Sequence, residues 1–290
     1  MISLDPKEEK TARIHAMILG AVAPRPIALA STLGKSGIPN LSPFSFYNCF
    51  GSRPPILIFS PARRVRDNTS KHTLENVLIN SEVVINAVNY AMVNQVSLAS
   101  SEYAEGVNEF EKAGLTAIPS VRVKPFRVKE SPVQFECRVK EVIATGHEGG
   151  SGNLVICEIL LIHIKESVLN EAGKIDPNKI DLVARMGDDW YCRASGNSLF
   201  EVEKPLMKTG IGVDQIPEEI RMSSILSGND LGKLGNVEIL PGNEEIDAYK
   251  KDLDQTESIT LKTEEQRHRF AKKLLREGKA TEAWKALLMK

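Results

Sequence analysis

The chain has 290 residues, of which 42% are hydrophobic, and 37 lysines and arginines nearly balance 38 aspartates and glutamates. Glycine (20 residues) and proline (15 residues) occur at ordinary frequency, and the formal net charge is −1. This composition excludes a collagen-like or low-complexity chain, a wholly disordered acidic chain and a uniformly basic nucleic-acid binder, so we expect one large globular domain with an appendage, or two modest domains.

The first part of the chain alternates short strands with turns. A helix is predicted for residues 7–20, ending at Gly20 before the Pro24-Arg25-Pro26 segment. Strand-like runs follow at 26–33, 40–50 and 55–60, and clusters of glycine and proline between them mark turns. Residues 71–80 change to helical spacing, and a buried strand is predicted at 83–88.

The middle of the chain continues this pattern. Helical pieces are predicted for 90–101 and 107–113, two strands for 121–145 and one apolar strand for 153–164. A glycine-rich loop at 146–152 leads into that last strand. Many short strands with few helices favour an antiparallel barrel or sandwich over a parallel sheet.

The character of the sequence changes beyond about residue 195. Residues 243–257 hold six acids and two lysines, whereas 263–290 hold eight Lys or Arg and four acids. Thr263 and Gln266 suit a capping box, and apolar residues recur at helical spacing on either side of Gly278. We therefore divide the chain into a domain at 1–195 and an extension at 196–290. The extension is predicted to end in an amphipathic helical hairpin that packs on the body or on a second subunit. A nucleic-acid-binding tail is the alternative.

Signals for membrane insertion, export, disulfides and metal binding are not recognisable. The most apolar run, 154–164, is shorter than the roughly 20 residues of a membrane span. Residues 1–10 lack the basic start and apolar centre of a secretory signal, so we expect a cytoplasmic protein. The four cysteines are widely separated, and we expect buried, inert thiols at all four positions.

No motif predicts catalysis by protein side chains alone. The GxSxG, HExxH and Walker patterns are missing, and the glycine loop at 146–152 precedes a strand where a dinucleotide fingerprint precedes a helix. The five histidines lack ligand spacing, and His163 is expected to be a hydrogen-bonded core histidine. We therefore predict no catalytic side chain and no metal ligand, and expect a bound cofactor to supply any chemistry.

Residues 25–76 carry the clearest chemical signal. Small hydroxyl residues alternate with aromatic residues over 40–48, and Pro43 indicates an edge strand or a bulge. Lys71 and Thr73 lie at the start of a predicted helix, where unpaired amides and the helix dipole favour an anion. Together these features predict a planar apolar slot beside a phosphate site.

Three sequence blocks then become recognisable. They are residues 23–32 with 39–48 (APRPIALAST and PNLSPFSFYN), 54–60 (PPILIFS) and 71–77 (KHTLENV). In this order they resemble the flavin reductase-like, FMN-binding split-barrel family, and the runs at 154–159 and 185–191 resemble its later elements. The resemblance covers about residues 10–195. It implies a mainly β protein, an antiparallel Greek-key split β-barrel with peripheral helices, followed here by a C-terminal helical extension.

The resemblance also implies a homodimer with FMN in a groove at the subunit interface. A single edge strand over 40–48 is too shallow to bury the flavin ring, which makes a second subunit a natural wall. The implied cofactor contacts are Ala30, Ser31 and Thr32 along the flavin and its ribityl chain, Ser42, Pro43, Phe44 and Ser45 at the ring, Asn48 and Ser60 beside the ribityl-phosphate, and Lys71 and Thr73 at the phosphate, with Arg25 and Arg64 as further phosphate candidates. Ser31, Thr32 and Ser60 could instead be strand-end hydroxyls, and Phe44 and Phe46 core aromatics.

The implied activity is hydride transfer from NADH or NADPH to flavin, and some members of the family supply reduced flavin to a partner monooxygenase. Two departures from the family pattern favour an alternative, an FMN-binding electron carrier or flavin-holding module without nicotinamide turnover. His72 stands where the family has an acidic residue, and the loop before 153 lacks a histidine that shorter reductases carry. A scaffold that acts through its basic helical tail is a third hypothesis. No nucleic-acid or membrane partner is expected.

Overall fold

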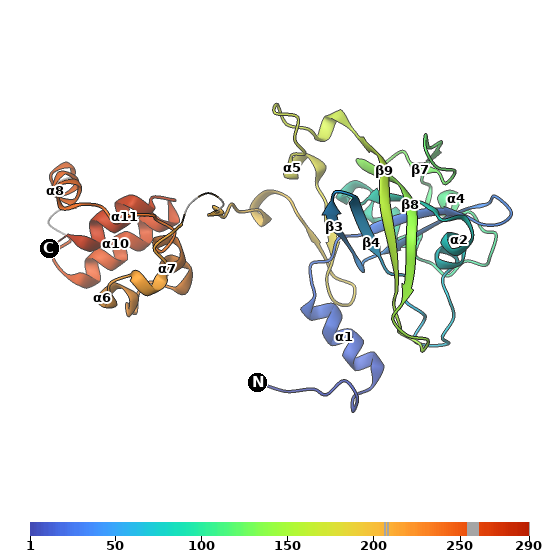
Figure 1. Ribbon diagram of the computed structural model, residues 1–290, viewed down its shortest axis with the longest axis horizontal. Coiled ribbons are helices and arrows are strands. Elements are labelled where there is room, and N and C mark those ends of the chain that lie inside the picture. The colour runs from blue at the N-terminus through green and yellow to red at the C-terminus, as the bar shows by residue number, and fades with distance from the viewer. Residues whose placement is uncertain (206, 208, 254–260, 290) are drawn as a thin grey trace. The chain divides into compact units, whose positions relative to one another are not determined.

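The computed structural model describes residues 1–205, 207, 209–253 and 261–289. Contacts within the chain divide it into two compact units, Met1–Phe200 and Glu201–Lys290 (Figure 1). No helix in the described ranges is long and apolar enough to cross a bilayer.

A seven-stranded antiparallel sheet forms the body of the first unit. In the order in which they pair, its strands are β2 (Pro39–Phe44), β1 (Ala28–Leu33), β5 (Glu82–Ala87), β8 (Val133–Ala144), β9 (Asn153–Ile164), β4 (Pro55–Phe59) and β3 (Tyr47–Ser52). β2 and β3 are the two edges, yet only Ser45 and Phe46 separate them along the chain. The sheet must therefore curl until its edges meet at this corner. Because β2 and β3 are not paired in the described sheet, the barrel is split between them, as predicted.

The barrel core is built from alternate residues of six strands, because side chains on a strand point to opposite faces in turn. Helix α2 (His72–Asn80) adds Leu74 and Val77 to it. The strand residues are Ala28, Ala30, Phe44, Leu57, Phe59, Val83, Ile85, Cys137, Val139, Val155 and Cys157. Burial raises the pKa of both core thiols, as expected for inert cysteines. The same prediction is wrong for Cys49, which lies exposed on an edge strand, and Cys192 is only half-buried.

A second apolar cluster covers the outer face of β1 and β2. Leu29 and Leu41 pack there with residues of α3 (Val93–Leu98) and α4 (Glu109–Ala113). β1 is therefore buried on both faces, which accounts for its nearly continuous apolar sequence.

The other α-helices and β-strands of the first unit lie outside the main sheet. They are α1 (Thr11–Ala21), β6 (Ala117–Ile118), β7 (Arg127–Val128), α5 (Pro177–Ile180), β10 (Val183–Arg185) and β11 (Tyr191–Arg193). One sequence prediction differs from the structure here. The strand predicted at 40–50 is two strands, because the chain crosses from one sheet edge to the other. The two strands predicted at 121–145 are present as the short β7 and the long β8, which forms a hairpin with β9 (Figure 1).

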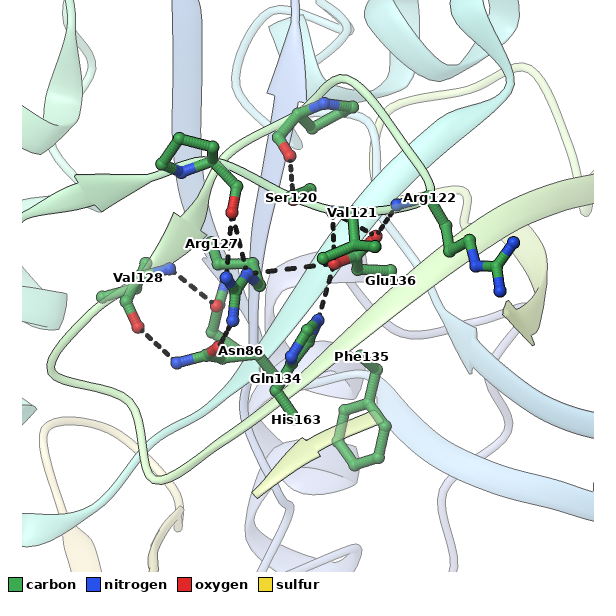
Figure 2. A network of polar contacts seen from close by, with 12 residues as sticks. Asn86, Ser120, Val121, Arg122, Arg127, Val128, Gln134, Phe135, Glu136 and His163 are labelled. Carbon is green, nitrogen blue, oxygen red and sulfur yellow. Dashed lines mark hydrogen bonds and ion pairs between the residues drawn. The ribbon is translucent and has the colours of Figure 1, made fainter. Parts of the chain in front are cut away.

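A buried carboxylate on β8 fixes the segment that precedes it (Figure 2). The side chain of Glu136 is fully buried and accepts the backbone N–H groups of Val121 (2.9 Å) and Arg122 (2.5 Å). Nε2 of His163 on β9 lies 2.7 Å from the same carboxylate, so His163 is hydrogen-bonded as predicted. Burial acts to raise the pKa of Glu136, but these hydrogen bonds outweigh it, and the pKa is lowered.

The second unit is helical. Its described helices are α6 (Glu218–Arg221), α7 (Gly228–Leu234), α8 (Asn243–Asp252), α10 (Glu264–Arg276) and α11 (Ala280–Leu288). The capping box at Thr263 and Gln266 is present, and Gly278 separates the last two helices with a φ of +77°. Their apolar faces pack on Ile216, Ile220 and Leu234 of the same unit. The end of the acidic stretch predicted at 243–257 lies outside the described residues from 254 onward.

Candidate functional site

The edge strand β2 accommodates a proline because of the direction of its backbone groups. The N–H of Leu41 points away from β1 and donates to the carboxylate of Glu109 at 3.0 Å. Side chains and N–H groups repeat every second residue, so Pro43 occupies the next outward position, where an N–H would lack a strand partner. The predicted edge position of this stretch is confirmed.

The two phenylalanines of the β2–β3 corner differ in burial. Phe44, expected either against the flavin ring or as a core aromatic, is buried in the barrel core with its ring 5.3 Å from that of Phe59. Phe46, expected in the core, is half-buried and lies edge-on to His15. The reason is the register, which pairs Phe44 with Ala28 on the core side of β1.

The residues of β1 are almost all buried, whereas a strand that lines a ligand site would expose some of its side chains. Ala30 faces the core opposite Ser42, and Ser31 faces the other side, opposite Leu41. The side chain of Ser31 is fully buried, and its Oγ has no hydrogen-bond partner within the described residues. Its expected place along the flavin stays a prediction.

Thr32 and Thr73, two residues of the predicted site, lie close together in the interior of the protein. Both hydroxyls donate to Oδ1 of Asn40, at 3.3 Å from Thr32 and 2.8 Å from Thr73. Nδ2 of Asn76 donates to Oγ1 of Thr32 at 3.0 Å. All four side chains are buried. The network thus joins β1, β2 and the first turns of α2.

Arg25 is committed to the protein backbone. Its buried guanidinium donates to the carbonyl oxygens of Leu19, Val22 (2.6 Å) and Met186 (2.7 Å), and its Nε lies 3.5 Å from Oγ of Ser45. Desolvation lowers its pKa, and the charge of Arg185 lowers it further. In this structure the side chain holds the end of α1 beside the corner, and its expected phosphate contact stays a prediction.

A basic loop precedes α2. Arg63, Arg64 and Arg66 lie within four positions, and Lys71 is the N-cap residue of the helix, with no side-chain cap of its own. Burial lowers the pKa of Lys71, and the positive charge of Arg64 lowers it further. Arg63 and Arg66 were absent from the predicted site, although this local run of arginines was a signal that could have identified the loop.

The same loop is braced by hydrogen bonds. Nη1 of Arg64 donates to Oγ1 of Thr69 (2.8 Å) and to the carbonyl oxygen of Ser70 (2.7 Å), and its Nε bonds Glu102 (3.0 Å). The N–H groups of His72 and Thr73 have no acceptor among the described residues, as is usual in the first turn of a helix. A negatively charged group would satisfy them.

The β8–β9 hairpin packs closely on this loop through its glycines. A Cβ at Gly149 would lie 3.0 Å from the carbonyl oxygens of Arg64 and Val65, and one at Gly152 would lie 2.8 Å from Oγ of Ser60. Oγ of Ser60 accepts the N–H of Asn153 at 3.0 Å. The glycine loop predicted only as a connection is therefore what lets the hairpin approach the loop.

The corner residues complete the surroundings. Asn48 lies exposed on β3 opposite Ile58, and Ser60 at the end of β4 donates its N–H to the carbonyl of Phe46 at 2.8 Å. The arrangement thus joins an edge strand, a corner and a positively charged helix start. In the described ranges, no group of three or more His, Cys, Asp or Glu side chains could hold a metal ion.

Comparisons with known proteins agree on the first unit. Residues 20–178 match the family model described as "Flavin reductase like domain". An uncharacterized protein of Aquifex aeolicus is 36% identical over 196 residues, which are 68% of this chain and 97% of that protein. Among solved structures, nitrilotriacetate monooxygenase component B from Bacillus cereus has a TM-score of 0.65 at 24% identity, covering 70% of this chain and 98% of its own. Flavoredoxin of Desulfovibrio vulgaris has a TM-score of 0.54 at 22% identity, covering 70% of this chain and 97% of its own.

Proposed function

Because the chain belongs to the flavin reductase-like family, we propose that it is an FMN-binding oxidoreductase that takes hydride from NADH or NADPH. The observation that carries the FMN assignment is the basic loop at the start of α2, where Lys71 and Arg64 lie beside unpaired backbone N–H groups. The proposed FMN-binding domain is residues 1–195.

The residues present fit a phosphate group. Burial and the positive charge of Arg64 lower the pKa of Lys71, and a phosphate beside Lys71 would oppose this effect. The N–H groups of His72 and Thr73 would donate to its oxygens, as helix starts commonly do. Thr73 would thus bind through its backbone, because its hydroxyl bonds Asn40.

The ring of the cofactor is assigned to the corner. The backbone of Ser42, Pro43 and Ser45 would face its polar edge, with Asn48 and Ser60 toward the ribityl chain, whereas Ala30, Ser31, Thr32 and Phe44 support these residues from the interior. Bound FMN would supply the hydride-accepting ring, and the protein would supply binding, orientation and exclusion of water. No side-chain acid or base is needed for this role.

The second candidate is an FMN-binding electron carrier or flavin-holding module. The hairpin residues just before Asn153 are Ser151 and Gly152, so neither position offers an imidazole for contact with a nicotinamide. The N–H of Gly152 donates to Oγ1 of Thr145. The likeness of fold to flavoredoxin is compatible with this candidate.

The proposed function predicts a simple spectroscopic result. Purified protein with added FMN should retain the visible flavin absorbance after gel filtration, and NADH or NADPH should bleach it rapidly in the absence of oxygen. Retained absorbance that neither nicotinamide bleaches would favour the carrier. Loss of all flavin on gel filtration, together with no binding in an FMN titration, would rule out both candidates.

A homodimer is proposed from the outer face of the barrel. Phe50 on β3 is 62% exposed and Ile143 on β8 is 42% exposed, and Ile58 and Ile156 of the strands between them are only half-buried. Large exposed apolar side chains on a sheet are typical of an interface, and Asn48 lies opposite Ile58 in the same sheet. We expect the wild type to sediment as a dimer at micromolar concentration and Phe50→Asp as a monomer. Val202→Asp, at a similarly exposed position in the other unit, should leave the dimer intact. A wild-type monomer would contradict the proposal.

The proposed partners and the proposed location also depend on the family to which the chain belongs. Flavin and nicotinamide are the proposed small-molecule partners, and a monooxygenase that consumes reduced flavin is a proposed protein partner, by analogy with monooxygenase component B. The proposed location is the cytoplasm, which suits four cysteines that all have free thiols. Cell fractionation that recovers the protein outside the cytoplasm would contradict it.

A further inference from the structure

A buried carboxylate lies behind the proposed anion site without contacting it. Glu109, at the start of α4, is only 5% exposed. Its Oε1 accepts Nδ2 of Asn40 and its Oε2 accepts the N–H of Leu41, both at 3.0 Å. A charged group this deeply buried is costly unless its partners are well placed, so the two hydrogen bonds are needed to keep it there.

The carboxylate determines the direction of every hydrogen bond in the network. Because a carboxylate can only accept, the amide nitrogen of Asn40 must face Glu109 and the amide oxygen must face away from it. That oxygen then accepts both the hydroxyl of Thr73 (2.8 Å) and the hydroxyl of Thr32 (3.3 Å).

The last member of this chain of contacts lies at the start of α2. Thr73 is the second residue of the helix, next to Lys71 and to the N–H groups that would bind phosphate. Asn76, one turn further on, donates to Thr32 and holds the same helix against β1. The orientation of one amide, set from α4, therefore controls where the first turn of α2 lies relative to β1 and β2.

We propose that Glu109 is a positioning residue for the phosphate site: through Asn40 and Thr73 it holds the first turn of α2 where its N–H groups and Lys71 can bind the phosphate of a flavin nucleotide. The inference rests on the proposed FMN binding. It predicts that Glu109 contributes to the affinity for FMN but not to the affinity for riboflavin, which has the same ring and no phosphate.

The test is a pair of fluorescence-quenching titrations on the full-length protein, one with FMN and one with riboflavin. In Glu109→Gln the new amide N–H₂ group faces a donor, either Asn40 or Leu41, so the network must rearrange. We expect the Kd for FMN to rise about tenfold, the size of one hydrogen bond to a charged group. The Kd for riboflavin should stay unchanged.

Three variants control this experiment. Glu111 lies exposed on the same helix, where its carboxylate accepts a hydrogen bond from the side chain of Asn108. The variant Glu111→Gln should therefore bind FMN like the wild type. Lys71→Ala should weaken FMN but spare riboflavin, because it removes the phosphate contact directly. Thr73→Val keeps the side-chain shape and removes only the hydroxyl, so it should reproduce the selective loss if Glu109→Gln fails to fold.

The outcomes are distinguishable. Equal weakening of FMN and riboflavin, or unchanged binding of both in Glu109→Gln and Thr73→Val, would overturn the inference. If the wild type binds neither flavin, the proposed function fails and amide hydrogen exchange decides the positioning role. Faster exchange at residues 72–76 in Glu109→Gln than in Glu111→Gln would then support it, and identical exchange would overturn it.

Discussion

Replacement of Trp284 by alanine is expected to lower the free energy of unfolding of the C-terminal unit by about 3–5 kcal/mol, the usual range when a large buried aromatic side chain is removed. Trp284 is fully buried among apolar residues of α6, α7, α10 and α11. Its indole N–H also donates to the carbonyl oxygen of Leu234 at 2.9 Å. The substitution therefore leaves both a cavity and a buried acceptor that has lost its donor.

The chain offers a matched control for this prediction, because it has only two tryptophans. Trp190 is 75% exposed in the first unit, and Trp190→Ala should change the stability by less than about 0.5 kcal/mol. In Trp190→Ala the fluorescence of the remaining tryptophan reports the unfolding of the C-terminal unit. In Trp284→Ala, far-ultraviolet circular dichroism follows the loss of helix during urea unfolding. Equal midpoints for the two variants would contradict the prediction.

The second large effect is expected from Glu136→Gln, which should destabilise the first unit by about 3 kcal/mol at neutral pH, because hydrogen bonds to a buried charge are strong. The neutral amide has one acceptor oxygen for the N–H groups of Val121 and Arg122, so its own N–H₂ group must face a donor (Figure 2). His163 loses its charged partner as well. Arg127, whose Nε lies 3.8 Å from the carboxylate, is the other charged group in the network.

The pH dependence has a definite sign. The pKa of Glu136 is lowered below 4.5 in the folded protein, so its stabilising contribution is fully present above the unfolded value and is lost as the pH falls through the folded value. The stability difference between wild type and Glu136→Gln should therefore be largest near neutral pH and shrink in acid, below about pH 4. Urea unfolding of both proteins across this range measures it.

Glu141→Gln is the control, since Glu141 lies exposed on the same strand. It should track the wild type at every pH to within about 0.5 kcal/mol. A gap between wild type and Glu136→Gln that stays constant from neutral to strongly acidic pH would show that the carboxylate acts through packing alone.

The strand order of the barrel could be predicted only from the family resemblance, whereas its elements followed from local patterns. Periodicity placed β1, β4, β5 and α2 because each has its own apolar rhythm and its own turn residues. The corner at Ser45 and Phe46 could not be seen this way. Nothing in two residues indicates that the strands on either side belong to opposite edges, because closure of the sheet is a tertiary event.

In the candidate site, too, local features could be predicted and contacts between distant residues could not. Lys71 and Thr73 were correctly placed at a helix start, because N-terminal position follows from local spacing. The contacts of Arg25 could not be predicted in full, because its carbonyl partner at Met186 is distant in sequence, although Leu19 and Val22 are close to it. Glu109 was missed for a related reason, since its partners Asn40 and Leu41 are far away in the chain. A short polar motif predicts what kind of group a residue can bind. It does not predict which neighbouring group in the folded protein forms a hydrogen bond with that residue.

A capping box in the C-terminal unit could have been predicted from the sequence. Ser227 and Asp230 form a capping box at the start of α7, with Oγ of Ser227 accepting the N–H of Asp230 at 3.3 Å and the carboxylate of Asp230 accepting the N–H of Ser227 at 2.8 Å. The S-x-x-D spacing before an apolar residue predicts a helix start. Together with the capping box at Thr263 it would have indicated a helical unit with a core of its own.

The outward edge of β2 also bears on how the protein stays dispersed in a crowded solution. An edge strand with a row of unpaired N–H groups can pair with the edge of another molecule and begin an aggregate. Here the N–H of Leu41 is taken by Glu109, and the next outward position holds Pro43, which has none. The carboxylate of Glu109 and Pro43 thereby remove two successive hydrogen-bond donors that a strand of another molecule could use. The barrel can therefore keep an unpaired edge strand without aggregating through it.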